Sequence, residues 1–216
     1  MNLNQSYLHC WGRAVKVLTV SLMTICASCS KSSTNTESFL PLAVGNNWTY
    51  RVQFDPNAKK DDMMITYKVT GKEKVNDIDC FIFKREMVSQ APSIEYIEIT
   101  KDWLVSHKRV LGSLTMPLSP PQKFIKIPLE VGAKWKYADE VFVLDYEVNG
   151  EEEITVPAGT FKAIKITLNG LECAGPMSFQ YYSILWLSKG VGIVKEDSKA
   201  GMRYPFVARL VSKELK

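Results

Sequence analysis

The sequence predicts a mainly β protein: an antiparallel curved sheet or half-open barrel built from two related halves, with few or no helices after residue 28. Three observations predict this class. Short segments rich in β-branched and aromatic residues recur with turn signals between them. No window beyond residue 28 has a long apolar stripe at helical spacing. A ten-residue motif also occurs twice, with related segments following each copy in the same order.

The composition is that of an ordinary globular protein. Of the 216 residues, 46% are hydrophobic and 23% are charged, which excludes disordered, collagen-like and disulfide-scaffold classes. The formal net charge is only +4, too small to indicate a nucleic-acid-binding protein. The chain has two histidines, which leaves little room for histidine-based catalysis or metal binding.

The N-terminal residues have the pattern of an export signal. Arg13 and Lys16 precede a nine-residue apolar run, Val17-Leu-Thr-Val-Ser-Leu-Met-Thr-Ile25, and the first 28 residues contain no acid. A bilayer-spanning helix needs roughly 20 apolar residues. A basic start, a short apolar core and small residues after it are typical of a secretory signal peptide, here residues 1–28.

Small residues before a cysteine indicate where the signal ends. Ala27 and Ser28 directly precede Cys29, an arrangement that resembles the bacterial lipobox, with Cys26 standing where leucine is usual. Cys26 fits less well as the lipidated residue because bulky Ile25 precedes it. The resemblance implies cleavage before Cys29, a diacylglycerol on its sulfur and an acyl chain, such as palmitate, on its new amino group. A buried apolar N-terminal helix with incidental cysteines is the alternative.

The segment after Cys29 is polar and predicts a flexible tether over residues 29–38. Residues 39–216 are predicted to form one β domain. The lipid anchor would place that domain in the cell envelope, bound to a membrane. Ser30 does not supply the aspartate that would suggest retention in the inner membrane of enterobacteria, so the sequence favours the outer membrane.

The β domain repeats itself. Pro41-Leu-Ala-Val-Gly-Asn-Asn-Trp-Thr-Tyr50 recurs as Pro128-Leu-Glu-Val-Gly-Ala-Lys-Trp-Lys-Tyr137, with six identical positions. The pair Tyr67–Gly71 and Tyr146–Gly150 is a second echo, and Ile97–Val105 beside Leu185–Ile193 is a weaker third. These echoes predict halves at about 39–115 and 122–216, joined at Leu118-Ser-Pro-Pro121.

Each half is predicted to consist of strands. The apolar, β-branched and aromatic composition and the period-two alternation favour eight of them: Trp48–Phe54, Met63–Thr70, Cys80–Val88, Ile94–Thr100, Phe142–Val148, Phe161–Leu168, Phe179–Leu187 and Val207–Leu215. Val156-Pro-Ala-Gly-Thr160 predicts a turn in which Gly159 takes a positive φ. Asn149-Gly150 and Asn169-Gly170 are interpreted as turns or strand ends.

Five aromatic residues are candidates for the core or for the wall of a cleft between the halves. Trp48 and Tyr50 end the first copy of the motif, Trp135 and Tyr137 end the second, and Trp186 lies in the third echo. Large aromatic side chains dominate the energetics of protein cores, which favours the core interpretation.

Several segments together resemble one known group. They are Phe39–Tyr50, Tyr67–Val75, Pro128–Tyr137, Val156–Ile166, Trp186–Lys195 and Leu210–Ser212, an ordered set that covers nearly all of residues 39–216. The chain is similar in these segments to the TapB-like envelope proteins, a family of bacterial lipoproteins. The resemblance implies a β-rich envelope domain and supplies no catalytic residues.

The sequence offers little for catalysis, metals or cofactors. It has no nucleophile elbow, phosphate-binding loop, HExxH motif or paired CxxC. His107 has no nucleophile motif beside it, and Asp55–Asp62 clusters oxygens but has Lys59 and Lys60 among them, so a solvated loop is favoured over a calcium site. We therefore expect no metal site, no cofactor and no enzyme activity.

Cys80 and Cys173 are the two cysteines beyond the anchor, and the envelope is oxidising, so they are a candidate disulfide. The alternative is two reduced thiols, because the Cα separation that decides between them cannot be derived from sequence.

Three functions remain open. The first is a non-catalytic lipoprotein that binds an apolar ligand or a partner protein. The second is an accessory subunit of an envelope complex with a solid core, for which Met116, Pro117 and Leu118 supply an apolar linker face. The third and least favoured is a carboxylate-based hydrolase, which would need acidic residues gathered in a deep pocket.

Overall fold

The structure is a computed structural model, and it describes residues 38–54, 63–139, 141–174, 177–200 and 205–216. All of them belong to one unit, Ser33–Lys216. The predictions for the signal peptide, for Cys29 and the tether up to residue 37, and for the Asp55–Asp62 loop lie outside the described residues.

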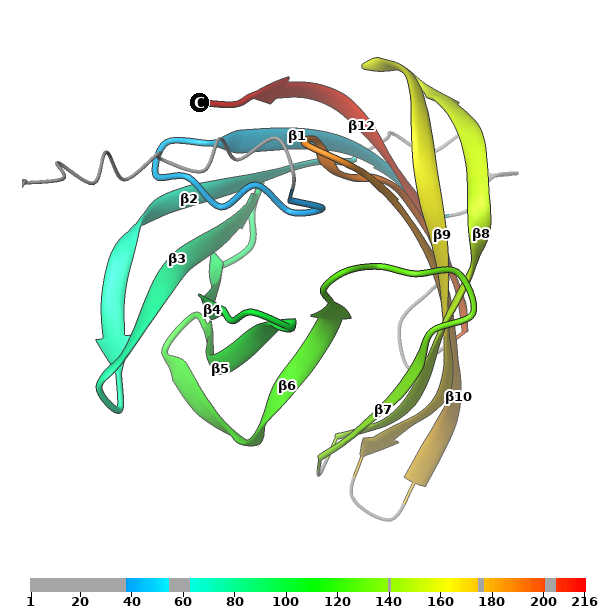
Figure 1. The fold of residues 1–216 in the computed structure, drawn as a ribbon. Coiled ribbons are helices and arrows are strands. Elements are labelled where there is room, and N and C mark those ends of the chain that lie inside the picture. Colours follow the sequence, from blue (N-terminus) through cyan, green and yellow to red (C-terminus); the bar gives the residue numbers. More distant parts are fainter. Residues whose placement is uncertain (1–37, 55–62, 140, 175–176, 201–204) are drawn as a thin grey trace, which may run out of the picture. The chain divides into compact units, whose positions relative to one another are not determined.

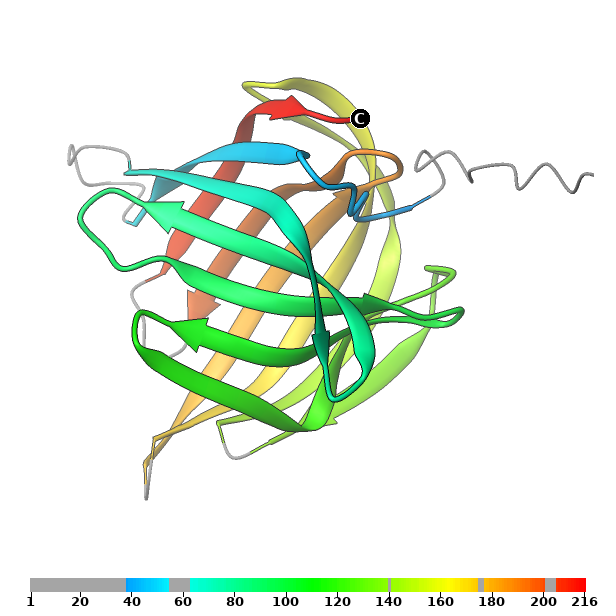
Figure 2. The same ribbon diagram turned by 90° about the vertical axis from the view of Figure 1, so that its left-hand side faces the viewer.

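The described part of the chain forms one sheet of twelve antiparallel strands. The strands are β1 (Asn47–Gln53), β2 (Met63–Val75), β3 (Ile78–Met87), β4 (Ser93–Ile99), β5 (Trp103–Leu111), β6 (Leu114–Lys126), β7 (Lys134–Ala138), β8 (Phe142–Val156), β9 (Gly159–Ala174), β10 (Met177–Ser188), β11 (Gly192–Ala200) and β12 (Phe206–Glu214). The sheet curls into a nearly closed, barrel-like arrangement (Figure 1 and Figure 2). The predicted fold class, a curved sheet or half-open barrel, is confirmed.

The order of strands in the sheet is β6-β5-β4-β3-β2-β1-β12-β11-β10-β9-β8-β7. Each strand from β1 to β6, and each from β7 to β12, therefore pairs with its neighbours in sequence. The two series join through β1 and β12, which come from opposite ends of the domain. The sheet's two edges are β6 and β7, which are not hydrogen-bonded to each other.

The two copies of the ten-residue motif make the same contacts. Trp48 lies opposite Tyr67 across β1 and β2, and Trp135 lies opposite Tyr146 across β7 and β8. The backbone N–H of Gly45 donates to Val69 at 2.8 Å, and that of Gly132 donates to Val148, also at 2.8 Å. The glycine of each copy has a positive φ, 97° at Gly45 and 86° at Gly132. The motif therefore forms a tight turn, after which the tryptophan side chain lies on the buried face.

Some sequence predictions need correction. Leu118-Ser-Pro-Pro121 is not a join but lies inside β6, and so do Met116 and Pro117. Proline cannot donate a ladder hydrogen bond and is tolerated on edge strands, which is the position of β6. Strands β5, β7 and β11 were also missed.

The Asn-Gly pairs and the predicted turn had different outcomes. Asn169-Gly170 lies within β9 and Asn149-Gly150 lies within β8 at a register shift, so neither ends a strand. The turn at Val156–Thr160 is confirmed: β8 ends at Val156, and Gly159 has φ 128°.

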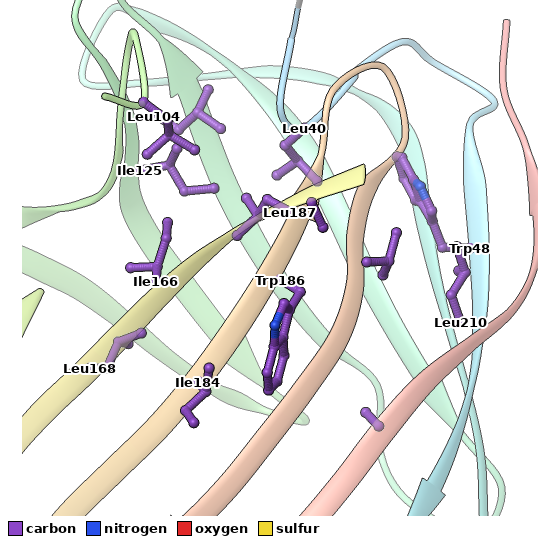
Figure 3. Packing of buried hydrophobic residues seen from close by; sticks show 14 of the residues in the cluster. Leu40, Trp48, Leu104, Ile125, Ile166, Leu168, Ile184, Trp186, Leu187 and Leu210 are labelled. Atoms are coloured by element: carbon purple, nitrogen blue, oxygen red, sulfur yellow. The ribbon is translucent and has the colours of Figure 1, made fainter. Parts of the chain in front are cut away.

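The buried face of the sheet forms one apolar cluster. Leu40, Leu42 and Leu129, from the segments that precede β1 and β7, pack against it. Figure 3 shows Trp48, Leu104, Ile125, Ile166 and Leu187 converging from five strands. No helix among the described residues is long and apolar enough to span a bilayer.

Candidate functional site

All five aromatic residues singled out by sequence are buried and belong to the apolar cluster. Trp48 is 1% exposed, and its indole Nε1 donates to the carbonyl of Val191 at 2.6 Å. The Tyr50 hydroxyl donates to the carbonyl of Ile193 at 2.6 Å. These two side chains therefore attach the start of the domain to the β10–β11 turn, close to the other end of the chain.

Trp135 and Tyr137 lie beside the gap between β6 and β7. The ring of Trp135 stacks on Tyr146 at 4.9 Å and meets the edge of Trp103 at 5.8 Å. The amide of Gln122 on β6 donates to the hydroxyl of Tyr146 on β8 at 3.2 Å. Side chains therefore join the two edges where the backbone hydrogen bonds stop, and we call this contact the seam.

A charged network continues from the seam across the neighbouring strands. The guanidinium of Arg109 donates to Glu95 at 2.7 Å and to Gln122 at 3.0 Å. The side chains of Arg109 and Glu95 are 22% and 31% exposed, so the pair is partly shielded from water. Sequence reasoning missed these residues because β5 and β6, which hold Arg109 and Gln122, were not predicted as strands.

Five tyrosines of this interior have raised pKa values. Burial raises the pKa of Tyr67 and of Tyr146 to about 12. Burial is also the main cause of the raised pKa values of Tyr50, Tyr137 and Tyr181, with the carboxylate of Asp139 adding to the effect on Tyr137. The phenols therefore resist ionisation in the folded protein.

We expect alkaline pH to unfold the protein. In the unfolded chain these phenols ionise near pH 10. Because their folded pKa values are higher, the stability they support is present below pH 10 and is lost as the pH rises towards 12. Urea unfolding at pH 8 and pH 11 should show a falling free energy, and tyrosinate absorbance should appear together with unfolding. Tyr67→Phe should make the loss between those pH values shallower; an unchanged slope would contradict the assignment.

Trp186 on β10 lies beneath two lysines of the neighbouring strands β9 and β11. The ammonium groups of Lys195 and Lys165 are 4.3 Å and 5.9 Å from its ring centre. Its Nε1 donates to the carboxylate of Glu152 at 2.5 Å. The Trp186 side chain is only 5% exposed. The two cation–π contacts stabilise the face of its ring, and the hydrogen bond to Glu152 gives its buried N–H an acceptor.

A hollow of about 480 Å³ opens to solvent at the end of the sheet where the described chain begins. Its apolar lining comes from Phe39, Phe161 and Ile164, and its polar lining from Glu151, Thr160, Lys162, Ser188 and Lys189. We call it the rim hollow. A second hollow, of about 280 Å³, lies beside Val44 and Val69.

Exposed apolar residues gather on β8 and β9. Val143 and Leu171 lie directly opposite each other, 48% and 39% exposed. Val141 lies two residues before Val143 and is 40% exposed, and its carbonyl accepts a hydrogen bond from the N–H of Cys173. We call Val141, Val143 and Leu171 the β8–β9 patch.

The remaining candidates are not brought together. Cys80 on β3 and Cys173 on β9 are both free thiols, and five strands separate β3 from β9 in the sheet, so the candidate disulfide is not formed. His107 on β5 contacts Glu98 at 2.8 Å through Nε2. No three His, Cys, Asp or Glu side chains within the described ranges converge as a metal site would require.

Comparison with known proteins identifies the fold. Residues 120–201 match the family model described as DUF3108-like. The solved structure of a candidate lipoprotein from Parabacteroides distasonis has a similar fold, with a TM-score of 0.55 and 16% identity, over 82% of this chain and 98% of that one. A candidate exported protein with a YmcC-like fold from Bacteroides fragilis gives a TM-score of 0.50 and 11% identity over the same shares. No curated protein matches the sequence.

Proposed function

We propose that this chain is a lipid-anchored, non-catalytic protein of the bacterial cell envelope, attached through Cys29 to the outer membrane. Two independent observations support the proposal. The residues before Cys29 have the order of a lipoprotein signal, namely a basic start, a short apolar core and small residues. The two structures of similar fold belong to a candidate lipoprotein and a candidate exported protein. The TapB-like resemblance agrees with both and is part of the same proposal.

Acylation at Cys29 is tested by replacing single cysteines. With radiolabelled palmitate in the bacterial host, we expect Cys29→Ser to lose all label and to keep its signal peptide, because the modified sulfur is gone. Cys26→Ser is the matched control and should be labelled and cleaved like the wild type. Label that persists in Cys29→Ser, or a wild type without label, would rule the anchor out.

The rim hollow supports an apolar ligand as the bound partner. Its volume, about 480 Å³, lies within the usual range of ligand sites, and such sites combine apolar walls with a few polar groups. Phe39, which lines the hollow, is the second of the described residues. The hollow therefore lies where the tether enters the domain. A ligand carrying an acyl chain fits this combination of position and lining.

Binding is tested with a dansyl-labelled fatty acid and the full chain. We expect saturable binding at one site and at least a tenfold rise in Kd for Ile164→Glu, which places a charge in the apolar wall of the hollow. Val88→Glu is the control because Val88 is 77% exposed and does not line the hollow. Equal affinities of the two variants, or absence of saturable binding, would remove the ligand from the proposal.

The β8–β9 patch favours an accessory subunit as a second candidate. Neighbouring apolar side chains exposed to water, here Val141, Val143 and Leu171, mark a contact surface more often than an isolated one does. A photocrosslinker at Leu171 in intact cells should trap one dominant envelope protein, whereas one at Val88 should not. Monomer alone from both positions would exclude this candidate.

A further inference from the structure

One row of cross-strand neighbours carries four cations. Arg51 on β1 lies opposite Arg209 on β12, which lies opposite Lys195 on β11. Lys195 lies opposite Trp186 on β10, which lies opposite Lys165 on β9. Directly opposite residues of antiparallel strands share a face, so the five side chains form one continuous line, which we call the cationic row.

The cationic row is on the outer face of the sheet. Arg51 is exposed while its neighbours Tyr50 and Val52 are buried. Lys195 alternates in the same way with Val194, which is 0% exposed. Since side chains alternate between faces along a strand, the cations of the row point away from the face that holds Tyr50, Val52 and Val194.

The row keeps a surplus of positive charge. Glu152 accepts the Trp186 N–H, and Asp197 on β11 is 4.0 Å from Lys199. Arg209 donates to the amide oxygen of Gln53 at 3.4 Å. Among the ion pairs of the described residues, none joins Lys165, Lys195 or Arg209 to a carboxylate. Like charges placed opposite each other destabilise a sheet, so folding alone does not explain the row.

The size and position of the row fit an extended anionic surface. Five strands spaced by about 4.8 Å spread its charges over roughly 19 Å, wider than a single small anion. The carbonyl of Ser38 accepts a hydrogen bond from the N–H of Gly190 at 2.8 Å, so the tether leaves the domain at the turn that joins β10 and β11, two of the five strands of the row. The nine Cα-to-Cα steps from Cys29 to Ser38 reach at most about 30 Å.

We propose that the cationic row binds the phosphate-bearing headgroups of an anionic lipid surface and holds this face of the sheet against it. The location at a membrane rests on the proposed lipid anchor, but the affinity of the row for the headgroups does not. Each cation near such a surface adds to binding, and salt screens the attraction.

The test uses the full chain carrying Cys29→Ser, so that no acyl chain contributes. Its binding to vesicles of phosphatidylcholine with phosphatidylglycerol is compared with binding to pure phosphatidylcholine, which measures any contribution of the N-terminal apolar segment. We expect stronger binding to the anionic vesicles, and a loss of about a hundredfold in Lys165→Gln/Lys195→Gln/Arg209→Gln. Raising the salt to about 1 M should remove the preference.

The matched control is Lys84→Gln/Lys134→Gln/Lys136→Gln, which changes net charge equally at lysines paired with Glu86, Glu147 and Asp145. It should keep most of the binding. Equal loss in the two triple variants, or no preference for anionic vesicles, would overturn the proposal. So would displacement by inorganic phosphate at constant ionic strength, because that result identifies a small-anion site.

The two proposals fail separately. Palmitate labelling of the wild type without any anionic preference would refute the cationic row and leave the anchor intact. An anionic preference without labelling would refute the anchor and leave the row intact.

Discussion

Gly170→Ala is expected to destabilise the protein by roughly 3 kcal/mol or more, because no space exists for even one methyl group. A Cβ added to Gly170 would overlap the backbone carbonyl of Val143 on the neighbouring strand β8. Backbone cannot rotate aside as a flexible side chain does, so β8 and β9 would have to separate where Gly170 pairs with Leu144. Urea unfolding of the two proteins at neutral pH measures the difference.

Gly150→Ala is the control for this substitution. Gly150 also lies within a strand of the same hairpin, but an added Cβ would meet nothing within 4 Å. Losing backbone freedom in the unfolded chain should make Gly150→Ala neutral or stabilising by up to about 1 kcal/mol. Similar losses from both alanines would show that β8 and β9 are not as close as the structure has them.

The same glycine shows why sequence alone misplaced some elements. Asn-Gly is a common turn pair, and nothing in Asn169-Gly170 itself reveals that another strand passes within contact distance. The β-class was predictable, because alternation and β-branched composition are local signals. The closeness of two backbones depends on pairing between segments and cannot be derived from either one.

Pairing also explains which parts of the site were missed. The sequence indicated the Trp48, Trp135 and Trp186 positions because large aromatics within apolar segments are visible locally. It did not indicate the cationic row, because Arg51 and Lys165 are 114 residues apart. Their alignment depends on the β1–β12 pairing and on register shifts at Thr49/Tyr50 and Trp186/Leu187. Each such shift changes which residues face each other.

Trp48→Ala is expected to cost about 3–5 kcal/mol, the usual range for removing a fully buried large aromatic side chain. The ring lies between β1 and the β10–β11 turn, contacts Phe83 edge-on at 5.9 Å, and is 1% exposed. The loss would weaken the contact that attaches the first strand to the last part of the sheet, so unfolding should remain cooperative but shift to a lower urea midpoint.

Phenylalanine substitutions separate the hydrogen bond of Trp48 from its packing. Trp48→Phe and Trp135→Phe remove the same volume at equivalent positions of the two motifs. Trp48 Nε1 donates to Val191, whereas Trp135 Nε1 is buried and has no partner within the described part of the chain. Trp48→Phe leaves the Val191 carbonyl without its donor, while Trp135→Phe removes an unsatisfied N–H. We therefore expect Trp48→Phe to cost about 1–3 kcal/mol more than Trp135→Phe in urea unfolding, and equal costs would mean that the indole N–H contributes nothing to the attachment.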